Sequence, residues 1–212
     1  MSKAVILLGG GGHARVLLGM LRRLQVEVLG VVDPLLAVGS DWLGCRVLGG
    51  DDVVTGYGAE QIELVNGIGA MPKDAGNRAR VFTHFSGLGY RFSSVIDPRA
   101  FVADDAELAS GVQVMAGVII QAGTIIAENC IVNSGAIVEH DCRIGRHVHI
   151  APGVTLCGAV QVADEAHIGA GAVVIQGIAI GSRSIVGAAS VVTRDVGSRQ
   201  IVYPARSQIQ EL

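Results

Sequence analysis

Aliphatic side chains recur at every sixth position through the second half of the chain, without one change of phase. The residue four places after each of them is small or β-branched, as at Ala100, Cys142 and Ser190. An uninterrupted period of six predicts a β-helix of hexapeptide repeats, whereas an ordinary half-buried sheet has a period of two. The aliphatic positions are Ile96, Val102, Leu108, Val114, Ile120, Ile126, Val132, Val138, Ile144, Ile150, Leu156, Val162, Ile168, Val174, Ile180, Val186 and Val192.

Three hexads make one coil of eighteen residues, so this stretch supplies about five coils, stacked roughly 4.8 Å apart. The aliphatic and the small positions are both expected to point inward. Residues eighteen apart then lie above one another on the same face. One such column contains Ala122, His140, Gly158 and Gln176.

The first 95 residues lack the period of six and read as alternating strands and helices. This alternation predicts a Rossmann-like α/β domain with a parallel sheet and a ligand site beyond the carboxyl ends of its strands. The predicted domains are 1–95 (Rossmann-like), 96–193 (β-helix) and 194–212 (C-terminal tail). The predicted strands of the first domain are residues 4–8, 26–32 and 62–65, and the predicted helices are residues 13–24 and 75–88.

Three turns fall at that carboxyl edge. A glycine loop, Gly9–Gly12, follows the first strand, where its backbone N–H groups and the helix N-terminus can approach a phosphate. The third glycine of the dinucleotide fingerprint is replaced by Ala14 or Arg15, so a tight turn without a ligand remains an alternative. Asp33, after the second strand, can accept hydrogen bonds from a ribose or a base. The third turn is Asn66–Gly67.

Composition narrows the class of protein. The chain has 212 residues, half of them hydrophobic, and a formal charge of −3, which gives no reason to expect a nucleic-acid partner. Its four cysteines show no CxxC spacing, which favours a reducing compartment. The apolar run at the start is too short for a signal peptide or a membrane span. We therefore expect a cytoplasmic protein without membrane insertion.

His140 and Asp141 are the candidate catalytic pair. A neutral imidazole can take a proton from an attacking amine or hydroxyl near pH 7, and an adjacent carboxylate can hold its tautomer. Gly158 lies one coil beyond His140, where its N–H can meet a thioester oxygen as negative charge develops. His149 falls on a different face of the same coil, so only a neighbouring chain can bring it back to this site.

Several stretches resemble one bacterial family of sugar acyltransferases, which includes sialic acid O-acetyltransferases and the N-acetyltransferases of bacillosamine and perosamine biosynthesis. The resemblance covers nearly the whole chain and implies a left-handed β-helix. The stretches are residues 9–13 (GGGGH), 33–34 (DP), 66–69 (NGIG), 133–142 (NSGAIVEHDC), 147–153 (HVHIAPG) and 204–206 (PAR).

The resemblance implies a homotrimer that uses acetyl-CoA and a nucleotide-linked amino sugar, with active sites between subunits and no metal. His140 is similar to the family's general base and Asp141 to its orienting acid. The resemblance places His149, Gly158, Ala170 and Ala188 against acetyl-CoA, and Gly10, Gly11, Gly12, His13, Asp33, Asn66, Gly67 and Asn133 near the nucleotide sugar. Pro34 departs from the family pattern, in which a polar or basic residue often follows the aspartate.

The expected reaction is N-acetylation of the 4-amino group of a nucleotide-linked 4-amino-4,6-dideoxy sugar. Sugar O-acetylation is the nearest alternative, because a base beside a bound acceptor does not reveal whether the nucleophile is nitrogen or oxygen. A γ-type zinc hydratase with His140, His147 and His149 as ligands, and a non-catalytic scaffold, are two further alternatives.

Overall fold

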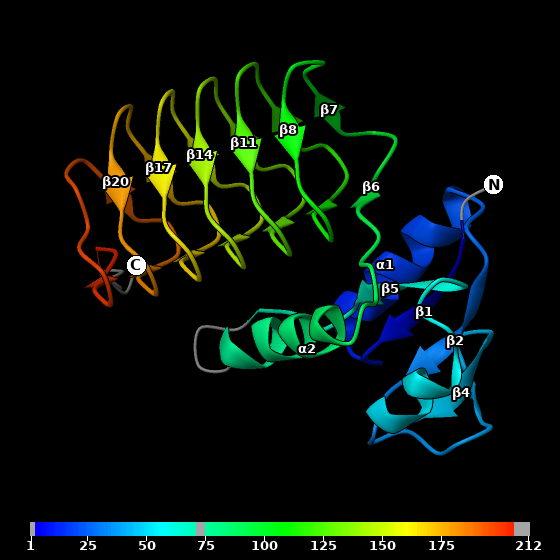
Figure 1. Cartoon of the computed structure of the whole chain (residues 1–212). Helices are drawn as coiled ribbons and strands as arrows, with labels where there is room; N and C mark the ends of the chain where they lie inside the picture. Colours follow the sequence, from blue (N-terminus) through cyan, green and yellow to red (C-terminus); the bar gives the residue numbers. More distant parts are fainter. Residues whose placement is uncertain (1–2, 71–74, 206–212) are drawn as a thin grey trace, which may run out of the picture.

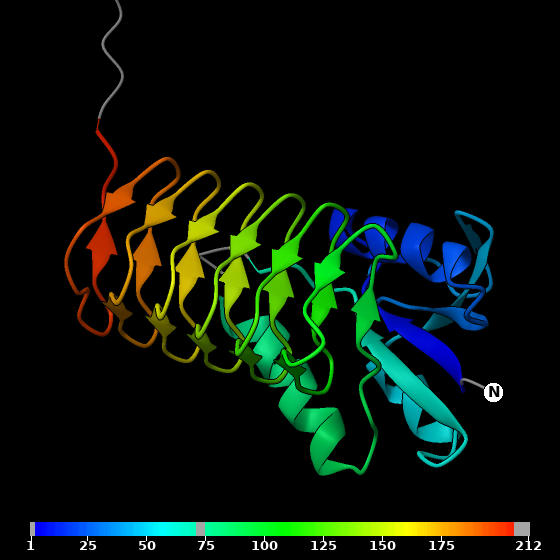
Figure 2. The same cartoon turned by 90° about the horizontal axis from the view of Figure 1, so that it is seen from above.

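The computed structural model describes residues 3–70 and 75–205. It consists of an α/β domain and a parallel β-helix, and the α/β domain lies at the first-coil end of the helix (Figure 1). Figure 2 shows that helix α2 (Ala75–Gly87) lies beside the early coils, while the later coils extend away from the α/β domain. No helix in the described ranges is long and apolar enough to cross a membrane.

The α/β domain is built on a five-stranded sheet of order β3-β4-β2-β1-β5, in which β1 pairs in parallel with β2 and β5. The predicted strands and helices are confirmed, with boundaries shifted by up to two residues. The β3–β4 hairpin was not predicted, because Leu43 and Gly44 form its turn with positive φ and Leu43 gives no turn signal. The elements are β1 (Ala4–Leu8), α1 (Gly12–Arg23), β2 (Val28–Val32), β3 (Asp41–Trp42), β4 (Cys45–Gly49), the 3-10 helix η1 (Asp51–Gly56), β5 (Ile62–Asn66) and α2.

The β-helix has three faces, and each strand pairs in parallel with the strand eighteen residues away. Face 1 contains β7 (Phe101–Val102), β10 (Ile119–Ile120), β13 (Ile137–Val138), β16 (Thr155–Leu156), β19 (Val173–Val174) and β22 (Val191–Val192). Face 2 contains β8 (Glu107–Leu108), β11 (Ile125–Ile126), β14 (Arg143–Ile144), β17 (Gln161–Val162) and β20 (Ala179–Ile180). Face 3 contains β6 (Val95–Ile96), β9 (Gln113–Val114), β12 (Ile131–Val132), β15 (His149–Ile150), β18 (His167–Ile168), β21 (Ile185–Val186) and β23 (Ile201–Val202).

The predicted inward register is confirmed. Every sixth-position aliphatic from Val114 to Val192 is buried, and so are the residues of the second register from Val112 to Ser190, including Cys130 and Cys142. Ile96 is 36% exposed, because it lies in the first coil, which has no coil beneath it. Paired strands continue past residue 193, since β23 pairs with β21.

Polar contacts join the two parts of the chain. The buried carboxylate of Asp97 lies 2.8 Å from Arg23 on α1 and 2.9 Å from Arg99. Hydrogen bonds from both guanidinium groups hold the pKa of Asp97 below its usual range. These contacts fix α1, and the glycine loop that precedes it, relative to the first coil.

Candidate active site

His140 and Asp141 lie at the corner where face 1 meets face 2. The His140 Nδ1 is 2.8 Å from the Asp141 Oδ2, and the two side chains are 61% and 67% exposed. Asp141 has a left-handed backbone (φ 60°), and its N–H donates to the carbonyl of Ala122 one coil below. The carboxylate therefore favours a proton on Nδ1 and leaves Nε2 available to a substrate.

Gly158 lies directly above this imidazole. A Cβ built on Gly158 would lie 2.6 Å from both Cε1 and Nε2 of His140. The Ala159 N–H donates to the carbonyl of His140, which confirms that the two turns stack. Only glycine leaves room for the ring in this position, so the predicted column brings the His140 imidazole and a side-chain-free backbone together.

A second site lies between the glycine loop and the outer side of face 3. This cavity, here called the acceptor pocket, has a volume of about 640 Å³. A Cβ on Gly11 or Gly12 would meet nothing within 4 Å, so the loop presents open backbone that a phosphate can approach. The lining includes Gly9, Gly11, Gly12, His13, Asp33, Gly67, Asn133, Ser134 and His149.

Asp33 and Gly67 shape this pocket through the backbone. The Asp33 carboxylate accepts hydrogen bonds from the N–H groups of Gly10 (2.7 Å) and Leu35 (2.8 Å). A Cβ on Gly67 would lie 2.6 Å from the carbonyl oxygen of Leu8 and 2.8 Å from the Cβ of Ala14. Gly67 is thus required for close packing against the glycine loop, and Asp33 supports that loop while facing the pocket.

The imidazoles of His13 and His149 both border the acceptor pocket. The His149 Nδ1 is 2.9 Å from the Ala70 carbonyl, and its Nε2 is 3.4 Å from the Asn133 Nδ2. Burial lowers the pKa of His13 and of His149 to about 4, with Arg78 adding to the effect at His13 and His167 at His149. Both rings are therefore neutral at pH 7.

Asn66 lies outside the pocket lining. Its side chain is buried and donates to the Arg78 carbonyl (3.1 Å) and the Asn129 Oδ1 (3.2 Å). Arg78, on α2, donates to the carbonyls of Asn66 (2.8 Å) and Ile68 (2.7 Å), and burial lowers its pKa to about 9. Arg78 thus holds both ends of the turn that contains Gly67.

The acceptor pocket and His140 lie at opposite edges of face 1. The pocket reaches Ser134, at the corner where face 3 meets face 1, and β13 then crosses face 1 to His140. Ala170 and Ala188 lie on the same corner as Ser134, stacked one coil apart, and the Ala189 N–H donates to the Ala170 carbonyl. One chain therefore does not bring its own His140 to its own pocket.

Comparison with known proteins identifies the family. The model for bacterial transferase hexapeptide repeats matches residues 123–158. PerB from Caulobacter crescentus, solved with CoA and GDP-perosamine, is 36% identical, with 93% of this chain and 92% of that chain covered and a TM-score of 0.85. This chain belongs to the sugar acetyltransferases of the left-handed β-helix type. Among curated proteins, none matches.

A second solved acetyltransferase extends the similarity to nearly all of this chain. The acetyltransferase domain of PglB from Neisseria gonorrhoeae, solved with acetyl coenzyme A, is 28% identical, with 98% of this chain and 100% of that chain covered and a TM-score of 0.87. WeeI from Acinetobacter baumannii, at 23% identity and a TM-score of 0.81, shows the shared fold.

The structure brings the predicted site residues together in two groups, and it places His149, which was predicted to contact acetyl-CoA, beside the acceptor pocket, while Gly10 and Asn66 lie outside the pocket lining. His140, Asp141 and Gly158 lie together on one corner, whereas Gly11, Gly12, His13, Asp33, Gly67, Asn133 and His149 line the pocket. Gln113, Arg78 and Asn129 were not predicted. Gln113 occupies an outward position that is normally solvated, and its burial depends on the α/β domain that covers it.

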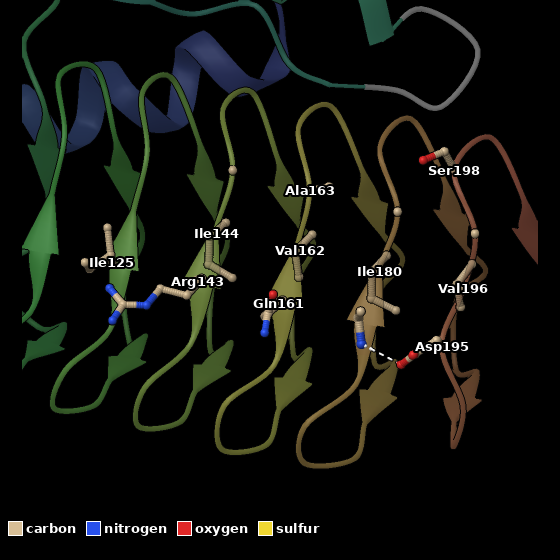
Figure 3. Close-up of a pocket in the computed structure, with 14 residues that line it drawn as sticks. Ile125, Arg143, Ile144, Gln161, Val162, Ala163, Ile180, Asp195, Val196 and Ser198 are labelled. Carbon is tan, nitrogen blue, oxygen red and sulfur yellow. Dashed lines mark hydrogen bonds between the residues drawn. The ribbon is translucent and has the colours of Figure 1, made fainter.

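A hollow of about 560 Å³ lies on the outer side of face 2 (Figure 3). Its floor is formed by small residues in successive coils, namely Gly145, Ala163, Gly181 and Gly197. Arg143 and Gln161 project beside this floor, and Asp195 closes one end by accepting from the Ala179 N–H at 2.8 Å. The hollow begins one strand beyond His140.

His147, a possible zinc ligand by sequence, has other contacts. Its Nδ1 is 2.9 Å from the Asn129 Nδ2, and its ring packs edge-on against Phe82. It occupies the corner between faces 2 and 3, away from the corner of His140. Within the described ranges, no group of three or more His, Cys, Asp or Glu residues is arranged to hold a metal ion.

Proposed function

We propose that this protein transfers an acetyl group from acetyl-CoA to the 4-amino group of a nucleotide-linked 4-amino-4,6-dideoxy sugar, with His140 as the general base. The observation that carries the proposal is the match over nearly the full length of PerB, a protein solved with CoA and GDP-perosamine. A variant of the GDP-perosamine N-acetyltransferase from the same organism matches to the same extent.

The proposed reaction is direct attack in a ternary complex. The sugar amine attacks the thioester carbonyl, a C–N bond forms, and the His140 Nε2 takes the proton that the amine loses. The C–S bond then breaks, the coenzyme A sulfur takes that proton from the His140 imidazolium, and coenzyme A leaves as the free thiol. Asp141, 2.8 Å from Nδ1, stabilises the imidazolium, while the Gly158 N–H faces the carbonyl oxygen as its charge develops.

This reaction needs a second chain, because the pocket and His140 lie at opposite edges of face 1. The outward side chains of face 1 are largely apolar: Phe101, Ile119, Ile137, Thr155, Val173 and Val191. Three copies that turn face 1 toward a common axis bury these apolar side chains. The same arrangement brings the His140 corner of one subunit to the Ser134 corner of the next. The proposed assembly is therefore a homotrimer with three shared sites.

The same arrangement offers a place for the acyl donor. Between adjacent subunits, the hollow on face 2 of one chain flanks the corner of Ala170 and Ala188 of the next. We propose that coenzyme A lies in this cleft with its thioester near His140 and Gly158, and that His149 and Asn133 border the point where the acetyl group meets the sugar. The nucleotide sugar occupies the acceptor pocket, with its diphosphate on Gly11 and Gly12.

Assembly is tested by sedimentation of the parent and of Val173→Arg, which places a charge on face 1. We expect a trimer for the parent, and dissociation with loss of activity for the variant. Glu107→Arg, at an exposed position of face 2, is the control and should stay trimeric. A parent that sediments as a fully active monomer would refute the shared site.

The acceptor is tested by assaying thiol release from acetyl-CoA with UDP-, GDP- and dTDP-linked 4-amino sugars and with free sialic acid. Transfer to one of the amino sugars supports the proposal. Exclusive transfer to sialic acid would favour the O-acetyltransferase alternative, which uses the same residues. Asp141→Asn should reduce kcat less than His140→Ala, because it removes the orienting charge and leaves the base.

Location in the cytoplasm, and the division into residues 1–95, 96–193 and 194–212, stay predictions from the sequence.

A further inference from the structure

Gln113 links the pocket-lining histidine of the α/β domain to the β-helix. Its Oε1 lies 2.7 Å from the Nε2 of His13, and its Nε2 donates to the carbonyl oxygen of Asn66 at 2.8 Å. Gln113 lies on β9 of face 3 and is completely buried, whereas His13 belongs to the first turn of α1. The contact therefore crosses the junction between the two parts of the chain.

The Asn66 carbonyl determines which way the Gln113 amide points. A carbonyl oxygen only accepts hydrogen bonds, and this one also accepts from Arg78 at 2.8 Å. The NH₂ group of Gln113 must therefore face Asn66, and its oxygen must face His13. An amide oxygen also only accepts, so the proton in this contact belongs to the His13 Nε2.

A neutral imidazole carries one proton, so its other nitrogen then holds a lone pair. Burial, reinforced by the positive charge of Arg78, lowers the pKa of His13 to about 4 and keeps the ring neutral. We propose that Gln113 fixes His13 as the Nε2–H tautomer, so that the His13 Nδ1 accepts a hydrogen bond from an N–H or O–H group of the sugar in the acceptor pocket. The proposal rests on the proposed function for the identity of that sugar.

Gln113 is thus a positioning residue. His13 accepts a hydrogen bond from an N–H or O–H group of the sugar but does not remove the proton. The surroundings of His13 oppose an imidazolium, because Arg78 and the neutral His149 offer it no compensating charge. This division of labour leaves proton removal to His140, at the solvent-exposed corner of the neighbouring subunit.

The tautomer can be measured without any turnover. The full-length protein labelled with ¹⁵N in its imidazole rings, with His13→Asn to assign the signals, should show a protonated Nε2 and an unprotonated Nδ1 for His13 at pH 7. Gln113→Leu should give a mixture of tautomers. An Nδ1–H tautomer in the parent would overturn the proposal, whether or not acetyl transfer to a nucleotide sugar has been found.

Kinetics test the consequence for the acceptor. Gln113→Leu should raise the KM for the nucleotide sugar roughly tenfold, as expected for one misdirected hydrogen bond, while kcat and the KM for acetyl-CoA stay within about twofold. Ser184→Ala, which removes another buried polar side chain of the stack, is the matched control and should leave all three constants unchanged. An unchanged KM in a folded Gln113→Leu would refute the role of His13 in binding.

Gln113→Glu tests whether residue 113 controls the tautomer of His13 or only supports the ring sterically. A carboxylate still accepts from the His13 Nε2, but it favours the imidazolium, whose Nδ1 donates. The KM for the nucleotide sugar should therefore be high at pH 6 and fall at pH 8 in this variant, and be constant over that range in the parent.

A nucleotide sugar that lacks the 3-hydroxyl identifies the group that donates to the His13 Nδ1. If the 3-hydroxyl donates, Gln113→Leu should not raise the KM for this acceptor any further. If the amine donates, Gln113→Leu should raise that KM as it does for the normal acceptor.

Discussion

Gly158→Ala tests the stacking of the catalytic corner with a single methyl group. The added Cβ would lie 2.6 Å from the His140 ring, whereas ordinary contact begins at 3.4 Å, so the ring must move by about 0.8 Å (3.4 − 2.6). A shift of this size can stretch the 2.8 Å bond between Nδ1 and Asp141 to about 3.6 Å, beyond hydrogen-bond range. Displacement of a catalytic group by about 1 Å costs up to roughly 10²-fold in rate, or about 2.7 kcal/mol of transition-state stabilisation.

The assay is steady-state thiol release, with the melting temperature measured in parallel. We expect kcat to fall by about 10²-fold, while both KM values and the melting temperature stay close to those of the parent, because the backbone N–H of residue 158 remains. Gly56→Ala, where a Cβ meets nothing within 4 Å, is the matched control and should be silent. A Gly158→Ala enzyme with parental kcat would show that His140 works from another position, or that another group is the base.

Four further outcomes are expected. His140→Ala should lower kcat by at least about 10²-fold, because it removes the positioned base, and a near-parental kcat would assign the base to another group. Gly12→Val should raise the KM for the nucleotide sugar and leave that for acetyl-CoA unchanged, because its side chain enters open pocket space; equal losses would indicate a structural loop. Ile144→Asp should destabilise the protein by about 3 kcal/mol or more, since it buries an unpaired charge, and a melting temperature within a degree of the parent would contradict the register. Urea unfolding should show a lower free energy of unfolding at pH 5 than at pH 7.5. Burial holds the pKa of His13 and His149 to about 4 in the folded chain, whereas the same side chains take up protons near pH 6.5 in the unfolded chain, so falling pH favours unfolding. Equal stability at the two pH values would contradict those shifts.

The β-helix was predictable because one rule repeats along it. Each hexad tests the same requirement, an aliphatic residue that faces the interior, and no position between Val114 and Val192 breaks it. The same periodicity placed Gly158 above His140 before any contact was known. The stacking of Gly158 on His140 was therefore predictable from spacing, whereas the catalytic role proposed for the pair stays a prediction.

The domain junction was not predictable in this way. Gln113 donates a hydrogen bond to the carbonyl of Asn66 although the two residues lie 47 positions apart in the chain, and no local sequence pattern predicts such a contact. The predicted substrate contact at Asn66 stays untested, and its side chain supports the loop from behind the pocket. Arg78 reads as an ordinary surface residue of a polar helix, yet it is buried because α2 packs between the sheet and the coils.

The separation of His140 from its own pocket across face 1 has a genetic consequence. In the proposed trimer, each site takes its base from one chain and its pocket from the next. A mixed trimer of two differently defective chains therefore contains some sites in which both parts are intact. Co-expression of a His140→Ala chain with a Gly12→Val chain in equal amounts leaves about one quarter of the sites with both parts intact. At nucleotide-sugar concentrations below the raised KM, two alleles that are each impaired alone would then complement in one cell, whereas two copies of the same allele would not.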